Sequence, residues 1–163
     1  MKRSVKITSG LLLTVIMIFV VLTAIPNVTH HSTKAIIKKT LESVLVYKQL
    51  PDYNLLLDKG NNNIVVSNEN IDTNWISQLP GINITVLSPS AIQEKSKKDG
   101  EYLYLRFTKV DIGILIATVS LDNTWASPPN GNFGYLSGGR IKLKFYNILG
   151  NWVQSPIIES WIS

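Results

Sequence analysis

The chain has 163 residues, of which 45% are hydrophobic and 17% charged, with 16 lysines and arginines against 11 acidic residues and no cysteine. This length suits a single domain. Both histidines and both methionines lie within the first 33 residues, so residues 34–163 contain no His, Cys or Met. That composition excludes imidazole triads, thiolate nucleophiles, zinc fingers and disulfide frameworks from residues 34–163.

Residues 1–25 are predicted to direct the protein to a membrane. Three basic residues and no acid precede the uncharged stretch from residue 7 to 25, in which 14 of 19 residues are apolar. A signal-peptide core holds about 7–15 apolar residues and a membrane-spanning helix about 20, so the segment is a signal anchor or a signal peptide. Cleavage would have to follow Ala24, and Leu22 would then occupy a position at which signal peptides prefer a small residue. This favours the uncleaved anchor.

Export follows from the same charges. The basic end stays in the cytoplasm, so we expect the domain outside it, anchored through residues 7–25 or secreted if the signal is cleaved. Residues 34–163 carry a net charge of +2, so the isoelectric point near 9.4 comes mostly from the N-terminal tail. Together with export, this nearly neutral domain argues against a nucleic-acid partner.

The first half of the domain is predicted to contain two helices and short strands. Residues 26–33 are a linker, and a long amphipathic helix over 34–50 follows, ended by Pro51. Its apolar positions are Ile37, Leu41, Val44 and Leu45. Short strands are expected at 64–66 and 84–87, with an irregular crossing between them. Ser88-Pro89 then begins a helix that extends to Lys98.

The second half alternates with the period of a β-strand. Leu103, Leu105 and Phe107 share one face of the first strand. A second strand covers 115–121, a third 140–146 and a last one 152–162, in which the doublet Ile157-Ile158 predicts a bulge or burial on both faces. Residues 126–139 form a Pro- and Gly-rich loop between the second and third strands.

These elements predict an α+β domain over residues 34–163, with a curved, mainly antiparallel sheet around the first helix. The order of elements and the C-terminal turn Gly150-Asn151-Trp152, followed by Ser160-Trp161, resemble the NTF2-like (SnoaL-like) cone and, to a lesser degree, the cystatin-like roll. The resemblance implies a cone-shaped fold. Enzymes of the NTF2-like kind transfer protons with an Asp and often a His. A His–Asp pair is excluded here, because residues 34–163 contain no histidine.

Candidate binding residues lie on the outward strand faces and in the loop. Aromatic and basic side chains mix there, as on an ordinary solvated sheet face or on a docking surface for a partner. The binding candidates are Tyr102, Tyr104, Arg106, Trp125, Tyr135 and Arg140. No catalytic residue is assigned. No metal site is expected either, because His30 and His31 have no acidic residue nearby until Glu42, and no cofactor is implied.

The leading functional prediction is a non-catalytic, exported domain that binds a protein or a small molecule at the cone mouth and the 126–139 loop. Two alternatives stay open. One is a His-free lyase or isomerase with a lone carboxylate from Asp111 or Asp122, although both acids read as solvated residues at strand ends. The other is a cystatin-like protease inhibitor that presents its hairpin loops.

Overall fold

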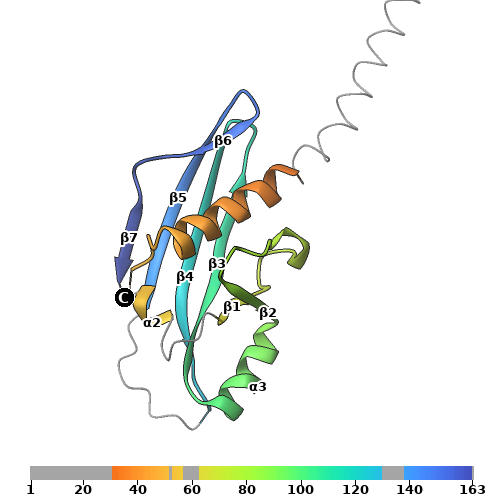
Figure 1. Ribbon diagram of the computed structural model, residues 1–163, viewed down its shortest axis with the longest axis vertical. Coiled ribbons are helices and arrows are strands. Elements are labelled where there is room, and N and C mark those ends of the chain that lie inside the picture. Colours follow the sequence, from red (N-terminus) through yellow and green to blue (C-terminus); the bar gives the residue numbers. More distant parts are fainter. Residues whose placement is uncertain (1–30, 52, 57–62, 130–137, 163) are drawn as a thin grey trace, which may run out of the picture.

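The computed structural model describes residues 31–51, 53–56, 63–129 and 138–162 (Figure 1). Residues 31–41 are α-helical and continue into a π-helical turn. The elements, in order, are η1 (Glu42–Val46), α2 (Tyr53–Leu56), β1 (Asn63–Ser67), η3 (Thr73–Trp75), β2 (Asn83–Leu87), α3 (Pro89–Asp99), β3 (Tyr102–Ile112), β4 (Ile116–Ala126), β5 (Gly139–Ile148), β6 (Asn151–Gln154) and β7 (Glu159–Ile162).

The predicted membrane segment, residues 1–25, lies outside the described residues. Within the described part of the chain, no helix is both long and apolar enough to cross a bilayer.

The strands form one curled, half-barrel sheet in the order β2-β1-β3-β4-β5-β6, so the predicted α+β class is confirmed. From β3 to β6 neighbouring strands are antiparallel, whereas β1 is parallel to both β2 and β3. The parallel edge was not predicted, because residues 64–66 and 84–87 are too short to reveal their partners.

The predicted single last strand over 152–162 is wrong, because it is two strands. β6 and β7 both pair with β5, along the same edge, and their registers differ by two residues. The break contains Pro156, which has no N–H to donate to a ladder. It also contains Ile157-Ile158, where the sequence predicted an irregularity.

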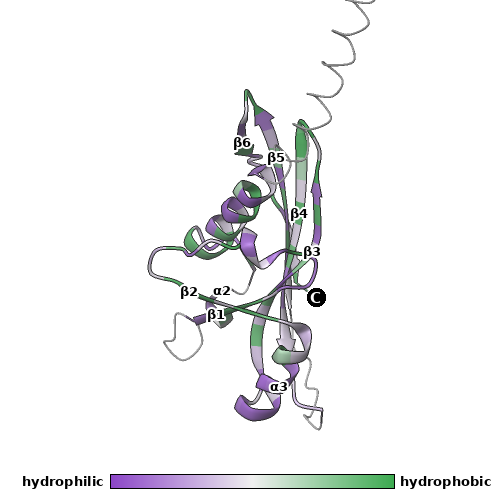
Figure 2. Cartoon of the chain, turned by 90° about the vertical axis from the view of Figure 1, so that its right-hand side faces the viewer, coloured by the Kyte–Doolittle hydropathy of each residue, from purple (hydrophilic) through white to green (hydrophobic). Residues whose placement is uncertain are grey.

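One helix covers one face of the sheet (Figure 2). Ile37 and Leu41 are fully buried, as are Phe107 and Phe145 on the facing strands, and all four belong to one core. The helix ends at Val46, four residues earlier than predicted, and residues 31–33, which were predicted to belong to the linker, are already helical. The chain leaves the helix at Tyr47, and Lys48 after it has a φ of 54°, in the left-handed region that commonly ends a helix.

Helix α3 packs on the opposite face. Ser88 caps it, since its hydroxyl accepts from the amide of Ala91 at 3.2 Å, and Gly100 ends it with φ of 86°. Ile92 is buried in a second, smaller cluster with Val65 and Ala126. The sheet therefore has a fully covered face and a partly covered one.

Phe107 is fully buried in the core, so shortening its side chain should strongly destabilise the fold. We expect Phe107→Ala to lower the free energy of unfolding by about 3–5 kcal/mol, because it removes buried apolar area and leaves a cavity. Lys109→Ala, in the same strand with a side chain 61% exposed, should change it by less than about 0.5 kcal/mol. Urea unfolding followed by tryptophan fluorescence measures both. Equal losses in the two variants would contradict this core.

Candidate functional site

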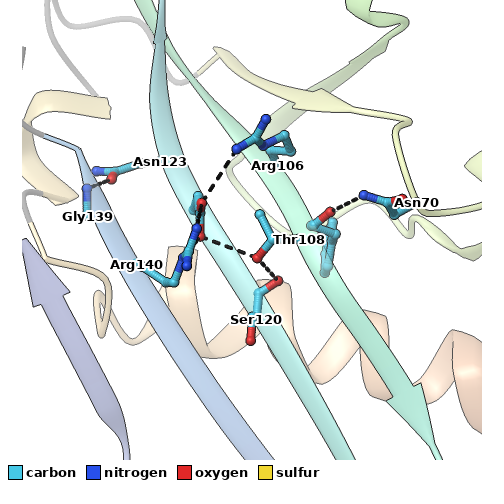
Figure 3. A network of polar contacts seen from close by, with 9 residues as sticks. Asn70, Arg106, Thr108, Ser120, Asn123, Gly139 and Arg140 are labelled. Atoms are coloured by element: carbon cyan, nitrogen blue, oxygen red, sulfur yellow. Dashed lines mark hydrogen bonds and ion pairs between the residues drawn. The ribbon is translucent and has the colours of Figure 1, made fainter. Parts of the chain in front are cut away.

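The site begins at a β-bulge in β3. The pairing of β3 with β4 shifts between Phe107 and Lys109, which leaves Thr108 as the extra residue. Asn70 stabilises the bulge by donating from its side chain to the carbonyl of Phe107 at 3.0 Å. Bulges re-aim side chains. Here the hydroxyl of Thr108 lies 3.4 Å from a carboxylate oxygen of Asp122 (Figure 3).

Asp122 lies at the centre of a row of charges across three strands. Arg106 of β3 is directly opposite Asp122 of β4, which is opposite Arg140 of β5. Arg140 donates to both carboxylate oxygens, from Nε at 2.5 Å and from Nη2 at 2.6 Å (Figure 3). Nη2 of Arg106 lies 3.7 Å from the same carboxylate. Asp122 is only 7% exposed, so the interpretation of this acid as a solvated strand-end residue is wrong.

The row has more positive than negative charge. The hydrogen bonds to Asp122 raise the pKa of Arg140 above its usual value, with the attraction of the carboxylate adding to them and desolvation opposing them. Nε of Arg106 is buried and has no acceptor among the described residues. A buried donor without an acceptor is unfavourable. Two guanidinium groups thus share one carboxylate, which leaves the row with an excess positive charge.

A cavity of about 720 Å³ opens over this row. Its floor contains Arg106, Asp122 and Arg140, and Trp125 lies at the end of β4. Gln93 of α3 and Trp161 of β7 also line it. The guanidinium carbon of Arg140 lies 5.5 Å from the centre of the Trp161 ring, a cation–π contact. The cavity therefore combines positive charge with aromatic surface.

The first residues of β5 hold the cavity's rim in place. Asn123 accepts from the amide of Gly139 and donates to the carbonyl of Pro51 at 3.2 Å. A side chain at Gly139 would come within 2.9 Å of both Asn123 and Pro51. Because only glycine fits this close approach, position 139 fixes where the loop rejoins the sheet.

The structure brings together three of the six predicted binding residues. Arg106, Trp125 and Arg140 line the cavity. Tyr104 lies on the same sheet face, opposite Thr124, and burial raises the pKa of its phenol. Tyr135 lies outside the described residues.

Tyr102 has a different position. Its hydroxyl donates to the carbonyl of Ile92 at 3.0 Å and its ring lies under the ammonium of Lys95 at 5.1 Å, so it attaches α3 to the sheet. It does not belong to the lining described above.

Sequence reasoning missed Asp122, Gln93 and Trp161 as lining residues. A signal for Asp122 was present: strand alternation places it on the face of Thr118 and Ser120, and the facing strands carry arginine on their outward faces. No local signal places Trp161 there, since its position depends on the pairing of β7 with β5.

The predicted cone mouth is not where this cavity lies. The helix-facing side of the sheet is filled by Ile37, Leu41, Phe107 and Phe145, all fully buried. The cavity lies on the opposite face, between α3 and β7, although its rim includes Ser127, Pro129 and Gly138 from the two ends of the predicted loop.

Within the described ranges, no three His, Cys, Asp or Glu side chains gather closely enough to hold a metal ion. In comparisons of sequence and of structure, no family model, curated protein or solved structure matches the chain.

Tyr102 gives a pH-dependent prediction. Burial raises its pKa to about 12, with Tyr104 and Asp99 adding to the effect. An unfolded tyrosine titrates near pH 10, at about its reference value. The fold therefore prefers the protonated phenol, and the resulting stability is fully present below pH about 10 and is lost as the pH rises towards about 12.

We expect Tyr102→Phe to cost about 0.5–1.5 kcal/mol of unfolding free energy at neutral pH, because it removes the hydrogen bond to Ile92. The difference in unfolding free energy between wild type and variant should become smaller as the pH rises from about 10 to about 12. Urea unfolding across this pH series measures it, with Tyr146→Phe as the control at neutral pH. A gap that stays constant would refute the role of the Tyr102 hydroxyl.

Proposed function

We propose that the domain binds a small anionic ligand in the cavity over Arg106, Asp122 and Arg140. The observation that carries this proposal is the unbalanced row of two guanidinium groups on one carboxylate, which lines the cavity. A carboxylate, phosphate or sulfonate oxygen in the cavity would accept from the exposed parts of the two guanidinium groups, whose side chains are 35% and 40% exposed, and would balance their excess charge. Guanidinium groups match the geometry of such oxyanions.

The ligand should also have a flat or apolar part. Trp125 and Trp161 both line the cavity, and Trp161 already stacks near Arg140. Aromatic side chains give large contact areas at low cost in conformational entropy. An aromatic carboxylate therefore fits both halves of the cavity better than a bare inorganic anion.

Binding is favoured over catalysis by the way Asp122 is held. Both of its oxygens accept hydrogen bonds from Arg140, and Thr108 and Arg106 approach from the other side. This carboxylate is oriented towards its arginines, where it fixes their positions. A general base would need a free oxygen directed at the substrate.

The proposal also includes the location of the domain and its relation to known folds. The basic end and apolar stretch of residues 1–25 support a domain outside the cytoplasm, anchored through residues 7–25 or secreted. Kinship with the NTF2-like or cystatin-like folds is supported by the curled sheet around one helix and by the turn at 150–152.

The test is a titration followed by NMR, with benzoate and inorganic phosphate as the probes. Both should shift the indole signals of Trp125 and Trp161, and benzoate should bind more tightly. Arg106→Gln should weaken benzoate binding about tenfold or more, because a hydrogen bond to a charged group contributes about 1.5–3 kcal/mol.

Lys144→Gln is the matched control. Like Arg106→Gln, it removes one positive charge from this face of the sheet, but on β5, four residues beyond Arg140, where Lys144 contacts Tyr146. Its affinity for benzoate should stay within about twofold of the wild type, since exposed charges contribute little. Binding that weakens equally in the two variants, or no shift of either indole signal, would refute the cavity as an anion site.

A further inference from the structure

Two hairpin tips at one end of the sheet expose apolar side chains. Ile114 and Leu115, between β3 and β4, are 83% and 68% exposed, and Leu149, between β5 and β6, is 98% exposed. The tips lie side by side, because Asn147 donates from its backbone to the carbonyl of Leu115 at 2.8 Å and from its side chain to that of Ile114 at 3.1 Å. Figure 2 shows hydrophobic colour at both tips.

The apolar surface continues onto the sheet face opposite the long helix. Ile116, Tyr146 and Val153 are directly opposite one another on β4, β5 and β6, and each is more than a third exposed. We call residues 114–116 together with Tyr146, Ile148, Leu149 and Val153 the tip patch. Contiguous exposed apolar surface of this kind marks a contact with a partner or a membrane.

The tip patch lies near the start of the described chain. The described part of the long helix starts in the same half of the molecule as the tips (Figures 1 and 2). In the sequence, residues 26–30 lie between residue 31 and the apolar segment that ends at Ile25. Six residue steps span at most about 22 Å even when fully extended. A membrane anchor at residues 7–25 would therefore bring the bilayer surface close to the tips.

The border of the tip patch has the chemistry of a membrane interface. Nζ of Lys144 lies 5.5 Å from the centre of the Tyr146 ring. Both residues lie on the same face of β5, and Lys144 is two residues farther from the tip. Tyrosine is enriched at bilayer interfaces, and a lysine beside it keeps its charge at the headgroups while its stem covers apolar surface. Lys144 also suits anionic lipids.

We propose that the tip patch inserts into the outer leaflet of the membrane in which residues 7–25 anchor the protein. The inference rests on the membrane part of the proposed function and is independent of the anion cavity. Insertion to a depth of about 5–10 Å would cover the tips and leave Tyr146 and Lys144 at the headgroups. The bilayer would then hold the domain at two places and fix its orientation.

The chain has no cysteine, so single cysteines can carry a fluorescent label without other changes. The full chain is reconstituted in phosphatidylcholine–phosphatidylglycerol vesicles with a bimane label at Leu149→Cys or Ile114→Cys. Both labels should emit at shorter wavelength than in solution, and lipids with a nitroxide near the headgroup should quench them. A label at Lys97→Cys, on exposed α3 at the other end, should show neither effect.

A second variant tests the mechanism of insertion. Leu149→Asp, at a site 98% exposed, should preserve the circular dichroism spectrum and abolish lipid quenching of the label at position 114. Quenching that persists at full strength would contradict insertion of the apolar tip.

Retention of the chain by vesicles after an alkaline wash distinguishes failure of the membrane anchor from failure of the tip insertion. If the chain is retained but the tip labels are not quenched, the tip inference is overturned and the anchor stands. If the chain is washed off, the anchor and the tip inference both fail. A blue shift that depends on the protein-to-lipid ratio, without quenching by lipid, would show contact between copies and overturn the inference.

Discussion

The packing of one helix against one face of β3, β4 and β5 determines where every other feature of the domain lies. Ile37 and Leu41 of the helix and Phe107 and Phe145 of the sheet are fully buried in this contact. Because side chains alternate along a strand, burying one face commits the intervening residues to the other. A shift of one residue in any strand would expose the core and bury the charges, so the packing also fixes the register.

The charge row is a direct consequence of that register. Arg106, Asp122 and Arg140 lie on the partly covered face of three adjacent strands and in one line across them. Asp122 is buried, yet its carboxylate is satisfied by Arg140, and a carboxylate in such surroundings requires partners of this kind. Two structural irregularities then turn the row into a cavity. The bulge at Thr108 brings its hydroxyl to Asp122, and the two-residue shift between β6 and β7 places Trp161 beside Arg140.

How much of this could be predicted from the sequence depends on the range of the interactions involved. The alternation of Ile141, Leu143 and Phe145 is local, and it predicted the buried face of β5 correctly. The Ser88-Pro89 start of α3 is also local and was predicted correctly. The parallel pairing of β1 with β2 and β3 joins segments whose strands have no local feature that distinguishes parallel from antiparallel neighbours.

The same reasoning explains the outcome for the site. Arg106 and Arg140 were found because outward-facing cations among aromatic residues are visible in a strand pattern. Asp122 was misread because the predicted strand ended at 121, whereas β4 continues to Ala126 and buries the acid between two arginines. Trp161 could not be placed, since nothing near it in sequence reveals that it pairs opposite Arg140.

The distance between the two proposed sites constrains what the cavity can bind. Ile116, in the tip patch, and Asp122, in the cavity floor, are six residues apart on β4, which corresponds to about 20 Å along a strand. With the tips in the leaflet, the arginine row would stand beyond the headgroups of the same membrane, because insertion reaches only about 5–10 Å. A lipid of that bilayer could not enter the cavity without leaving the bilayer. The two proposals together therefore favour a free anion or an anionic group on another molecule outside the membrane.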